Sequence, residues 1–283
     1  MNAIITGASS GIGQALALQL AEQGSTIVLA ARRVNKLNSL ATQIQDKGGI
    51  AHVVPTNLEN EEHVEQLALT SQSLMPTIDV VVHNAGRGLV ASVEDTSTEL
   101  WQRMITLNAT APFWLTRALL PRMKQQNKGH HIFVSSMAGK IGYPYNAAYV
   151  SAKHALVGFV AALRGELITT SINATVICPS GVATEWGSAT EGQIINDFYA
   201  TALPRSRQIA RDNNLTLAPL KKMLSAEQVA AIIMDVIATG RCNDIYTHQG
   251  TEDLAVQAQT NRISQEEEHR ALWMAMHEAY KRM

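Results

Sequence analysis

The stretch "IITGASSGIGQALA", residues 4–17, decides the fold. An apolar, β-branched run leads into three glycines, Gly7, Gly11 and Gly13, and helix-forming residues follow at once. Gly7 suits a tight turn, Gly11 lets the backbone approach a ligand, and Gly13 allows a helix to pack closely on a strand. The free N–H groups and the positive dipole end of such a helix attract a pyrophosphate. The order strand, glycine-rich turn, helix therefore predicts a nucleotide site at the start of an α/β fold.

The same alternation of strand and helix continues along the chain. Strand-like runs cover 2–6, 26–31, 50–56, 78–83, 130–135, 173–178 and 244–248, and helix-period segments cover 11–23, 35–47, 59–73, 97–126, 146–169 and 225–239. The strands are almost continuously apolar, as expected when both faces of a parallel sheet are covered. The pattern predicts one domain, residues 1–283, with a Rossmann-type, doubly wound sheet of seven parallel strands and helices on both faces.

Two segments depart from this alternation. Residues 180–224 indicate two or three helical pieces and no strand, with interruptions at Pro204 and Pro219. An insertion of this length after a strand predicts a lid over a ligand, because ligands bind beyond the carboxyl ends of parallel strands. Residues 251–283 indicate a helical tail whose apolar stripe, Leu272, Met276 and Tyr280, must pack either on this subunit's pocket or on a neighbour.

Composition excludes several classes of function. A net charge of −1 over 283 residues gives no electrostatic case for binding nucleic acid or an anionic membrane. Cys178 and Cys242 are too few for a disulfide framework and lack metal-ligand spacing. No apolar run approaches the roughly 20 residues of a membrane span, and a strand that begins next to Met1 leaves no room for a signal peptide. We expect a cytoplasmic protein that uses no metal.

A second signal lies in "AAYVSAKHAL", residues 147–156, where Tyr149 and Lys153 share one helix face. A phenol titrates near 10, so lowering its pKa by two to three units requires about 3–4 kcal/mol. An ammonium about 4 Å away supplies roughly 4 kcal/mol at an effective dielectric constant of about 20. We expect Lys153 to lower the pKa of Tyr149, and Tyr149 to exchange a proton with a substrate oxygen.

Four further motifs occur in a characteristic order. Thr-Gly-x-x-x-Gly-x-Gly opens the chain, "HNAG" ends the fourth strand, Ser136 lies thirteen residues before Tyr149, and "CPSGVATEW" follows the sixth strand. With these motifs the chain resembles the short-chain dehydrogenase/reductase family over nearly its whole length. The resemblance implies an oxidoreductase that interconverts a carbonyl and a secondary alcohol by hydride transfer at a nicotinamide cofactor, with Tyr149 as general acid/base.

The resemblance also implies a tetrad of catalytic residues, Asn108, Ser136, Tyr149 and Lys153. Ser136 would hydrogen-bond the substrate oxygen, and it matches the family better than Ser135 because Met137, Ala138 and Gly139 follow it. Lys153 would also hold the nicotinamide ribose, and Asn108 would position a water that relays protons to Lys153.

The choice of cofactor follows from the end of the second strand. Arg32 and Arg33 stand where an acid would bind the ribose of NAD, and guanidinium groups suit a 2′-phosphate. NADP(H) is therefore favoured and NAD(H) is possible; the alternative is a pair of solvated charges. The implied cofactor contacts are Gly7, Ser9, Ser10, Gly11, Ile12, Gly13, Arg32, Arg33, Asn57, Leu58, Asn84, Ala85, Gly86, Tyr149, Lys153, Pro179, Val182 and Thr184.

Three positions depart from the family pattern. Asn57 replaces an Asp that meets the adenine, Ser180 replaces a Gly, and His83 replaces an Asn. We interpret His83 as a hydrogen-bonded structural histidine at a strand end and not as a base.

The sequence leaves the substrate open. Aromatic and apolar residues predict an apolar pocket, with simple core packing as the alternative: Met137, Tyr143, Tyr145, Trp186, Phe198 and Tyr199. Basic residues in the lid fit either an anionic substrate or acyl carrier, or a solvated face: Arg205, Arg207, Arg211, Lys221 and Lys222. A resemblance to family members that act on steroid- or lipid-like carbonyls is a further indication.

The family pairs through two long helices, here 97–126 and 146–169, so the resemblance implies a homodimer or homotetramer. Two other functions stay open. One is an NADP-binding regulator or sensor without turnover, against which the complete tetrad argues. The other is a sugar-nucleotide epimerase or lyase, whose first turn has a different glycine spacing.

Overall fold

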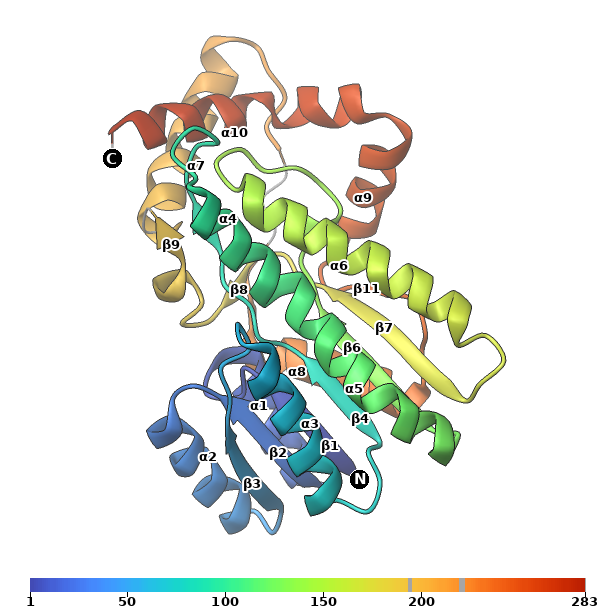
Figure 1. Cartoon of the computed structure of the whole chain (residues 1–283). Coiled ribbons are helices and arrows are strands. Elements are labelled where there is room, and N and C mark those ends of the chain that lie inside the picture. The colour runs from blue at the N-terminus through green and yellow to red at the C-terminus, as the bar shows by residue number, and fades with distance from the viewer. Residues whose placement is uncertain (193–194, 219–221, 283) are drawn as a thin grey trace.

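The computed structural model describes residues 1–192, 195–218 and 222–282, and Figure 1 shows its course. Within these ranges, no helix combines the length and the apolar character needed to span a membrane. The strands are β1 (Asn2–Thr6), β2 (Thr26–Ala31), β3 (Ile50–Pro55), β4 (Val80–His83), β5 (Leu89–Val90), β6 (Gly129–Val134), β7 (Ile172–Cys178), β8 (Val182–Ala183), β9 (Glu191–Gly192), β10 (Leu224–Ser225) and β11 (Asp244–Tyr246). The α-helices are α1 (Gly11–Ala21), α2 (Val34–Asp46), α3 (Glu61–Leu74), α4 (Thr98–Ile105), α5 (Ala111–Gln126), α6 (Ala147–Glu166), α7 (Ile195–Asp212), α8 (Ala226–Thr239), α9 (Thr251–Thr260) and α10 (Arg262–Arg282).

Seven of these strands form one parallel sheet in the order β11-β7-β6-β4-β1-β2-β3. From β1 the chain winds outward through β2 and β3, then returns to β4 and winds the other way. The direction of winding therefore reverses between β1 and β4, and a crevice for a ligand opens at the carboxyl ends of such a pair. The predicted doubly wound, seven-stranded, single-domain fold is confirmed.

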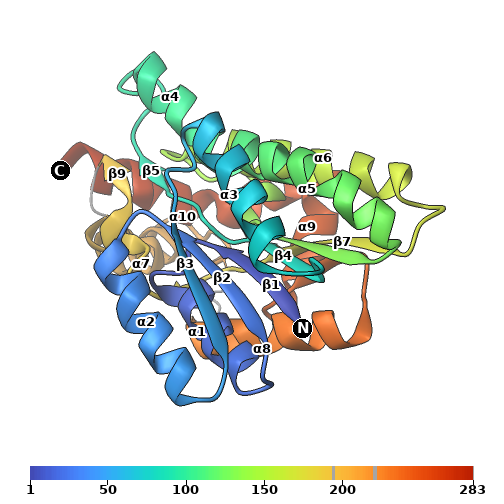
Figure 2. The same ribbon diagram turned by 60° about the horizontal axis from the view of Figure 1, so that its bottom comes forward.

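Helices cover both faces of the sheet (Figures 1 and 2). On one face α3, α5 and α6 pack over a core that includes Ile4 of β1, and on the other α1, α2 and α8 pack over a core that includes Ile5. Successive residues of a strand point to opposite faces, so neighbouring isoleucines serve two different cores. This explains why the strands are apolar throughout.

The predicted helix over 97–126 is not uniform. It consists of α4, a π-helical turn at Thr106–Thr110, and α5. A π turn inserts one extra residue into a helix and often marks a functional site. Asn108 lies in this turn, which the hydrophobic period of the sequence does not reveal.

The prediction for residues 180–224 was partly wrong. It has two helical pieces, a 3-10 turn at Gly187–Ala189 and the long helix α7, as predicted, but it also has short strands: β8 pairs with β10, and β9 pairs with β5. Pro204 lies inside α7 and does not end it. A proline removes one helical hydrogen bond, and burial of the apolar face of α7, which includes Phe198 and Ile209, outweighs that loss. Pro219 lies outside the described residues.

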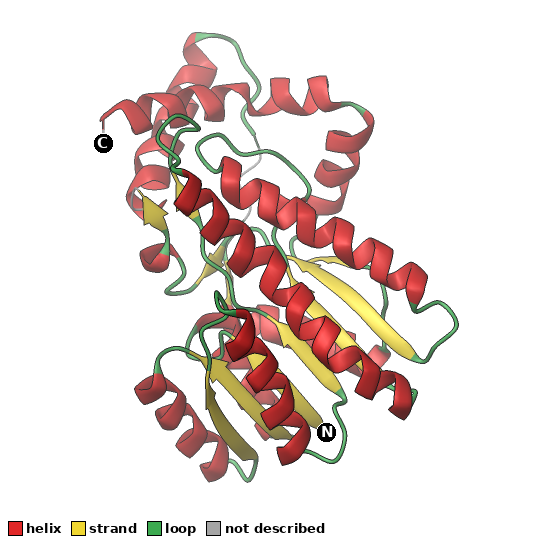
Figure 3. Ribbon diagram, viewed as in Figure 1, coloured by secondary structure: helices red, strands yellow, loops and turns green. Residues whose placement is uncertain are grey.

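The tail is two helices, α9 and α10, and not one (Figure 3). The break is at Asn261, whose side chain accepts a hydrogen bond from Ser264 N at 3.2 Å and so caps the second helix. Leu272 and Met276 of the stripe are buried in a cluster with Phe198 of α7. The tail thus packs on the 180–224 segment of its own chain.

Candidate active site and cofactor groove

The glycine-rich turn after β1 is fastened to the end of β4. The Thr6 hydroxyl accepts hydrogen bonds from Asn84 N at 3.0 Å and Ala85 N at 3.2 Å. The side-chain amide of Asn84 donates to Thr6 O at 3.0 Å and to Gly7 O at 3.2 Å. The two strands that flank the switch point therefore hold the turn rigidly at the mouth of the crevice.

Two of the glycines are required by this close packing. Gly7 has φ +65°, and a Cβ on it would lie 2.8 Å from Ala85 Cα. A Cβ on Gly13 would lie 2.6 Å from Asn84 Nδ2 and 2.7 Å from Gly7 O. A side chain at either position would separate the turn from β4 and from α1. The third glycine, Gly11, packs against the side chain of Thr184, because a Cβ on Gly11 would lie 3.2 Å from Thr184 Cβ.

The start of α1 is arranged to receive an anion. Ser10 is its N-cap residue, yet the Ser10 side chain makes no capping hydrogen bond. The Ser10 hydroxyl instead accepts from Arg33 Nη2 at 2.6 Å, and Ser9 Oγ accepts from Arg33 Nε at 3.1 Å. The N-cap side chain thus leaves the first N–H groups of α1 available, which fits the pyrophosphate expected here. Ile12, one residue into the helix, packs on the core.

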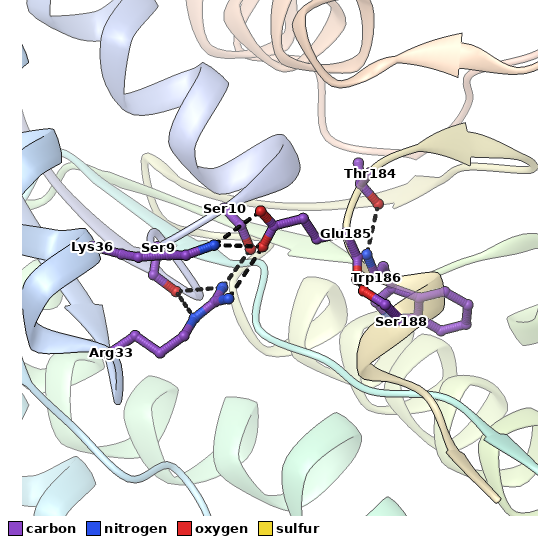
Figure 4. Close-up of polar contacts among 8 residues, drawn as sticks. All are labelled: Ser9, Ser10, Arg33, Lys36, Thr184, Glu185, Trp186 and Ser188. Atoms are coloured by element: carbon purple, nitrogen blue, oxygen red, sulfur yellow. Dashed lines mark hydrogen bonds and ion pairs between the residues drawn. The ribbon is translucent and has the colours of Figure 1, made fainter. Parts of the chain in front are cut away.

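A charged cluster lies beside this turn (Figure 4). Arg33 Nη1 is 3.2 Å and Lys36 Nζ is 2.7 Å from Glu185 Oε2. These two hydrogen-bonded cations hold the pKa of the Glu185 carboxyl below its ordinary value. Of the predicted arginine pair, it is Arg33 that meets the glycine-rich turn, and Arg32 is exposed. Lys36 and Glu185 were not predicted from the sequence. Lys36 could have been predicted, because it stands one helical turn after Arg33 and so faces the same side of the helix. No local pattern in the sequence pointed to Glu185.

The second predicted centre is built from β6 and α6. Ser136 follows β6, and its hydroxyl accepts from Ala138 N at 3.1 Å and hydrogen-bonds the Tyr149 phenol. Lys153 Nζ lies 5.7 Å from the centroid of the Tyr149 ring and donates to Val134 O at 2.9 Å. Ser135 points elsewhere, toward the backbone carbonyl of Lys153. The structure brings Ser136, Tyr149 and Lys153 together.

The prediction that Lys153 lowers the pKa of Tyr149 was wrong for the protein without cofactor. Burial raises the pKa of the Tyr149 phenol to about 12, against a smaller lowering by the Ser136 hydrogen bond. Burial also lowers the pKa of the Lys153 ammonium to about 8. Because the ammonium lies over the ring and donates to Val134, its attraction for a phenolate does not overcome desolvation. The phenol is thus held protonated, as an acid.

Asn108, in the π turn, is the fourth predicted catalytic residue. Its side-chain amide donates to Arg87 O and to Met104 O, both at 3.0 Å, and its Oδ1 accepts from Arg87 N at 3.3 Å. A Cβ on Gly86 would lie 2.8 Å from Asn108 Oδ1 and 3.4 Å from Lys153 Nζ. Gly86 therefore lies close to both Asn108 and Lys153, and a side chain there would crowd both. Both amide hydrogens of Asn108 already donate to backbone carbonyls. A water molecule here could therefore hydrogen-bond Asn108 only by donating to its Oδ1 or its backbone oxygen.

The predicted 179–184 contacts line the other side of the groove. Pro179 O accepts from Met137 N at 2.8 Å, Val182 pairs with Leu224 in the β8–β10 ladder, and Thr184 Oγ1 accepts from Trp186 N at 3.2 Å. His248, missed in the sequence, lies 3.3 Å from Ser180 N and 3.0 Å from Gly181 O and so fixes the turn that departs from the family pattern. Its position just after the last strand of the sheet was the available signal.

The other two departures are structural in this chain. Asn57 Oδ1 accepts from Glu59 N at 3.2 Å and so shapes the turn after β3, while Leu58 is buried in the core. His83 is buried, lies 3.2 Å from His131 Nδ1 and contacts Thr116 Oγ1 at 3.4 Å. These contacts agree with the interpretation of His83 as a hydrogen-bonded structural residue.

Aromatic side chains lie near Tyr149. The Trp186 ring lies 5.5 Å from the Tyr149 ring. Tyr199 contributes to the raised pKa of the Tyr149 phenol, and Tyr149 in turn contributes to the raised pKa of Tyr143. Three of the predicted pocket residues are instead packed: Met137 and Phe198 are buried in core clusters, and Tyr145 stacks on Tyr280 of the tail. Burial and neighbouring phenols keep the space beside Tyr149 apolar.

The basic residues of the 180–224 segment do not converge. Arg205 pairs with Glu278 of α10 at 2.6 Å, and Arg207, Arg211 and Lys222 are exposed. Lys221 lies outside the described residues. The described part of this set has the character of a solvated face.

Comparison with known proteins agrees with the motifs. The family model for short chain dehydrogenase matches residues 1–193. An uncharacterized oxidoreductase of Staphylococcus aureus (strain USA300) is 34% identical over 226 residues, which cover 77% of this chain and 96% of that protein. A Burkholderia phymatum short chain dehydrogenase/reductase in complex with NAD has a TM-score of 0.78 at 25% identity, covering 93% and 94% of the two chains. An alcohol dehydrogenase from the archaeon Thermococcus sibiricus, complexed with 5-hydroxy-NADP, has a TM-score of 0.72 at 25% identity, covering 87% and 95%. The chain belongs to the short-chain dehydrogenase/reductase family of oxidoreductases.

Proposed function

We propose that this oxidoreductase interconverts a carbonyl and a secondary alcohol with NADP(H), and that Tyr149 is its general acid/base. The observation that carries the proposal is the meeting of Ser136, Tyr149 and Lys153 at the carboxyl end of β6, next to the crevice between β1 and β4. A binding protein without turnover has no use for a buried, protonated phenol beside a serine hydroxyl.

The residues around the groove fit a nicotinamide dinucleotide with a 2′-phosphate. The start of α1 provides N–H groups for the pyrophosphate, and Arg33, with Ser9 and Ser10, provides donors where the adenosine ribose is expected. The middle of the cofactor would lie along Asn84, Ala85 and Gly86. Thr184, which packs on Gly11, would cover it from the other side. When bound, the nicotinamide supplies a hydride to the carbonyl carbon or accepts one from the alcohol.

Tyr149 provides the proton in the reductive direction. With its pKa raised to about 12, the phenol is protonated at neutral pH and can donate to the oxygen of a carbonyl as negative charge develops there. The reverse reaction needs the phenolate, which burial disfavours. Reduction forms the same phenolate once the proton has left, so Lys153 beside the ring has to offset its charge in both directions.

Ser136, Lys153 and Asn108 support this step in different ways. The Ser136 hydroxyl, already directed at the phenol, can donate to the same substrate oxygen and stabilise its developing charge. Lys153, held by Val134 O, can pass a proton toward Tyr149 and contact a ribose hydroxyl. Asn108 fixes the loop at Arg87 and so positions the floor of the groove.

The substrate that fits best is an apolar carbonyl compound. The Trp186 ring lies near the Tyr149 ring, and Tyr199 and Tyr143 add uncharged phenols to the same region. The described basic residues of the 180–224 segment are exposed or paired, so the structure offers less support for an anionic acyl carrier.

The test is NADPH and NADH consumption against a panel of ketones and aldehydes, and cofactor reduction with secondary alcohols. We expect turnover by the wild type and a loss of at least about 100-fold in Tyr149→Phe, because the proton donor is removed while the ring stays. NADPH binding should persist in Tyr149→Phe. Tight binding without turnover of any panel member by the wild type would instead favour an NADP sensor.

We further propose that the chain pairs through α5 and α6, which run side by side along one face (Figure 1). Phe113 of α5 is 41% exposed and packs its ring edge-on against Phe159 of α6. An exposed aromatic residue on a pair of long helices is typical of a subunit interface.

A further inference from the structure

The carboxylate of Glu185 occupies a site built for a stronger anion. Lys36 Nζ donates to its two oxygens at 2.9 and 2.7 Å, and Arg33 Nη1 donates at 3.2 Å (Figure 4). The remaining donors of Arg33 reach Ser9 Oγ and Ser10 Oγ. One carboxylate is thus surrounded by two cations, beside two serine hydroxyls.

The backbone of α2 adds to the positive electrostatic potential at this point. Arg33 is the N-cap residue of α2 and Lys36 lies in its first turn, where α2 has no acidic residue. The positive end of the helix dipole therefore adds to two side-chain cations at one point. Guanidinium, ammonium and hydroxyl donors in this arrangement match a phosphate, which has three oxygens and nearly two charges, better than a single carboxylate.

Glu185 reaches this point from the opposite wall of the groove. It follows Thr184, which packs over Gly11, and precedes Trp186, whose ring lies on Tyr149. Its side chain is 55% exposed, and among the described residues Arg33 and Lys36 are its polar partners, so it can swing away into solvent. An exposed ion pair of this kind is weak enough to be exchanged for a ligand.

We propose that Glu185 is a specificity residue for the cofactor: its carboxylate holds the place of the 2′-phosphate of NADP between Arg33 and Lys36. This inference rests on the proposed use of NADP. A dinucleotide with the 2′-phosphate has to displace Glu185, and one without it does not. Lys36 then joins Arg33 as a ligand of the phosphate, and Glu185 reduces the preference for NADP(H) over NAD(H) that these cations would otherwise give.

The experiment uses nucleotide fragments, so that no turnover is needed. The dissociation constants of 2′,5′-ADP and of ADP are measured by calorimetry for the wild-type protein, Glu185→Gln, Lys36→Met and Arg33→Ala. Glu22→Gln is the matched control, because Glu22 and Lys47 form an exposed ion pair elsewhere on the surface. We expect Glu185→Gln to bind 2′,5′-ADP about 5-fold more tightly and Lys36→Met about 5-fold more weakly, with ADP changed less than about 2-fold.

The outcomes separate the inference from the proposed function. If Glu185→Gln binds 2′,5′-ADP no better than the wild type, while Arg33→Ala loses affinity for it, the role of Glu185 is refuted and the use of NADP stands. If the wild type and Glu185→Gln both bind 2′,5′-ADP and ADP equally, and Arg33→Ala changes nothing, both are refuted. A selective gain in Glu185→Gln supports both.

Discussion

Acid should unfold this protein at a pH where most carboxylates are still ionised, because three histidines are buried in the central sheet. His83, His130 and His131 are each less than a tenth exposed. Burial lowers the pKa of His130 to about 4 and of His131 to about 3, and it holds the pKa of His83 well below its ordinary value of 6.5. His131 Nε2 also has no hydrogen-bond partner among the described residues. His130 and His131 are therefore neutral in the folded protein at mildly acidic pH, and burial opposes protonation of His83 as well.

The magnitude follows from proton linkage. Below pH 6.5 the unfolded chain binds protons at these imidazoles and the folded chain does not, so stability falls as the pH falls toward the folded-state pKa values. Between pH 7.5 and pH 5, each imidazole that stays neutral in the fold lowers the free energy of unfolding by about 2 kcal/mol. His130 and His131 together remove about 4 kcal/mol, a large part of the whole stability of many domains, and His83 acts in the same direction.

The assay is urea unfolding followed by circular dichroism at pH 7.5, 6.0 and 5.0. His131→Leu keeps an apolar side chain of similar size in the core and removes one titrating group. We expect this variant to lose about 2 kcal/mol less than the wild type between pH 7.5 and pH 5. His63→Gln is the control, because His63 is exposed on α3 and its loss should leave the pH dependence unchanged.

The carboxylates do not produce the same signal, since their unfolded-state pKa values near 4 place their effect below pH 5. An equal loss of stability in wild type and His131→Leu over this range would refute the reasoning. It would mean that His131 is already protonated, or accessible to water, in the fold.

The remaining predictions concern the site and the surface. Ser136→Ala should lower kcat by about 100-fold to 1000-fold through loss of a donor to the developing oxyanion, with NADPH affinity unchanged by fluorescence titration. The rate of carbonyl reduction at saturating NADPH should be independent of pH below about 8 and should fall above it, because Lys153, with a pKa of about 8, loses its proton there. Lys153→Arg should move this fall to higher pH. An unchanged profile in the variant would assign the fall to another group. Gly13→Ala should cost about 1–3 kcal/mol of stability by crowding the turn after β1, whereas Gly165→Ala, where nothing lies within 4 Å, should be neutral or stabilising in thermal unfolding. Phe113→Glu should halve the mass measured by light scattering if α5 and α6 form the interface, and an unchanged oligomer would place the interface elsewhere.

The sequence by itself determined the architecture and the order of the site. Periodicity along the chain reports burial, and apolar runs at strand length alternating with helical stripes were enough to predict the seven-stranded sheet. The glycine-rich turn and the Tyr149–Lys153 spacing are local, since each depends on backbone geometry within a few residues. The place of Ser136 beside Tyr149 came instead from the resemblance to the family, because no local geometry links residues thirteen positions apart.

Only the tertiary structure decided how these groups act on one another. Arg33 and Glu185 are 152 residues apart and meet because two different strands end at one crevice. The raised pKa of Tyr149 depends on everything packed around it, and helix spacing to Lys153 predicted a shift in the opposite direction. The π turn at Asn108, the continuation of α7 through Pro204, and the packing of the tail on that helix depend likewise on packing between distant segments. Local periodicity shows which side chains are buried. Only the assembled fold brings together the partners that set the pKa values of those side chains and the contacts they make.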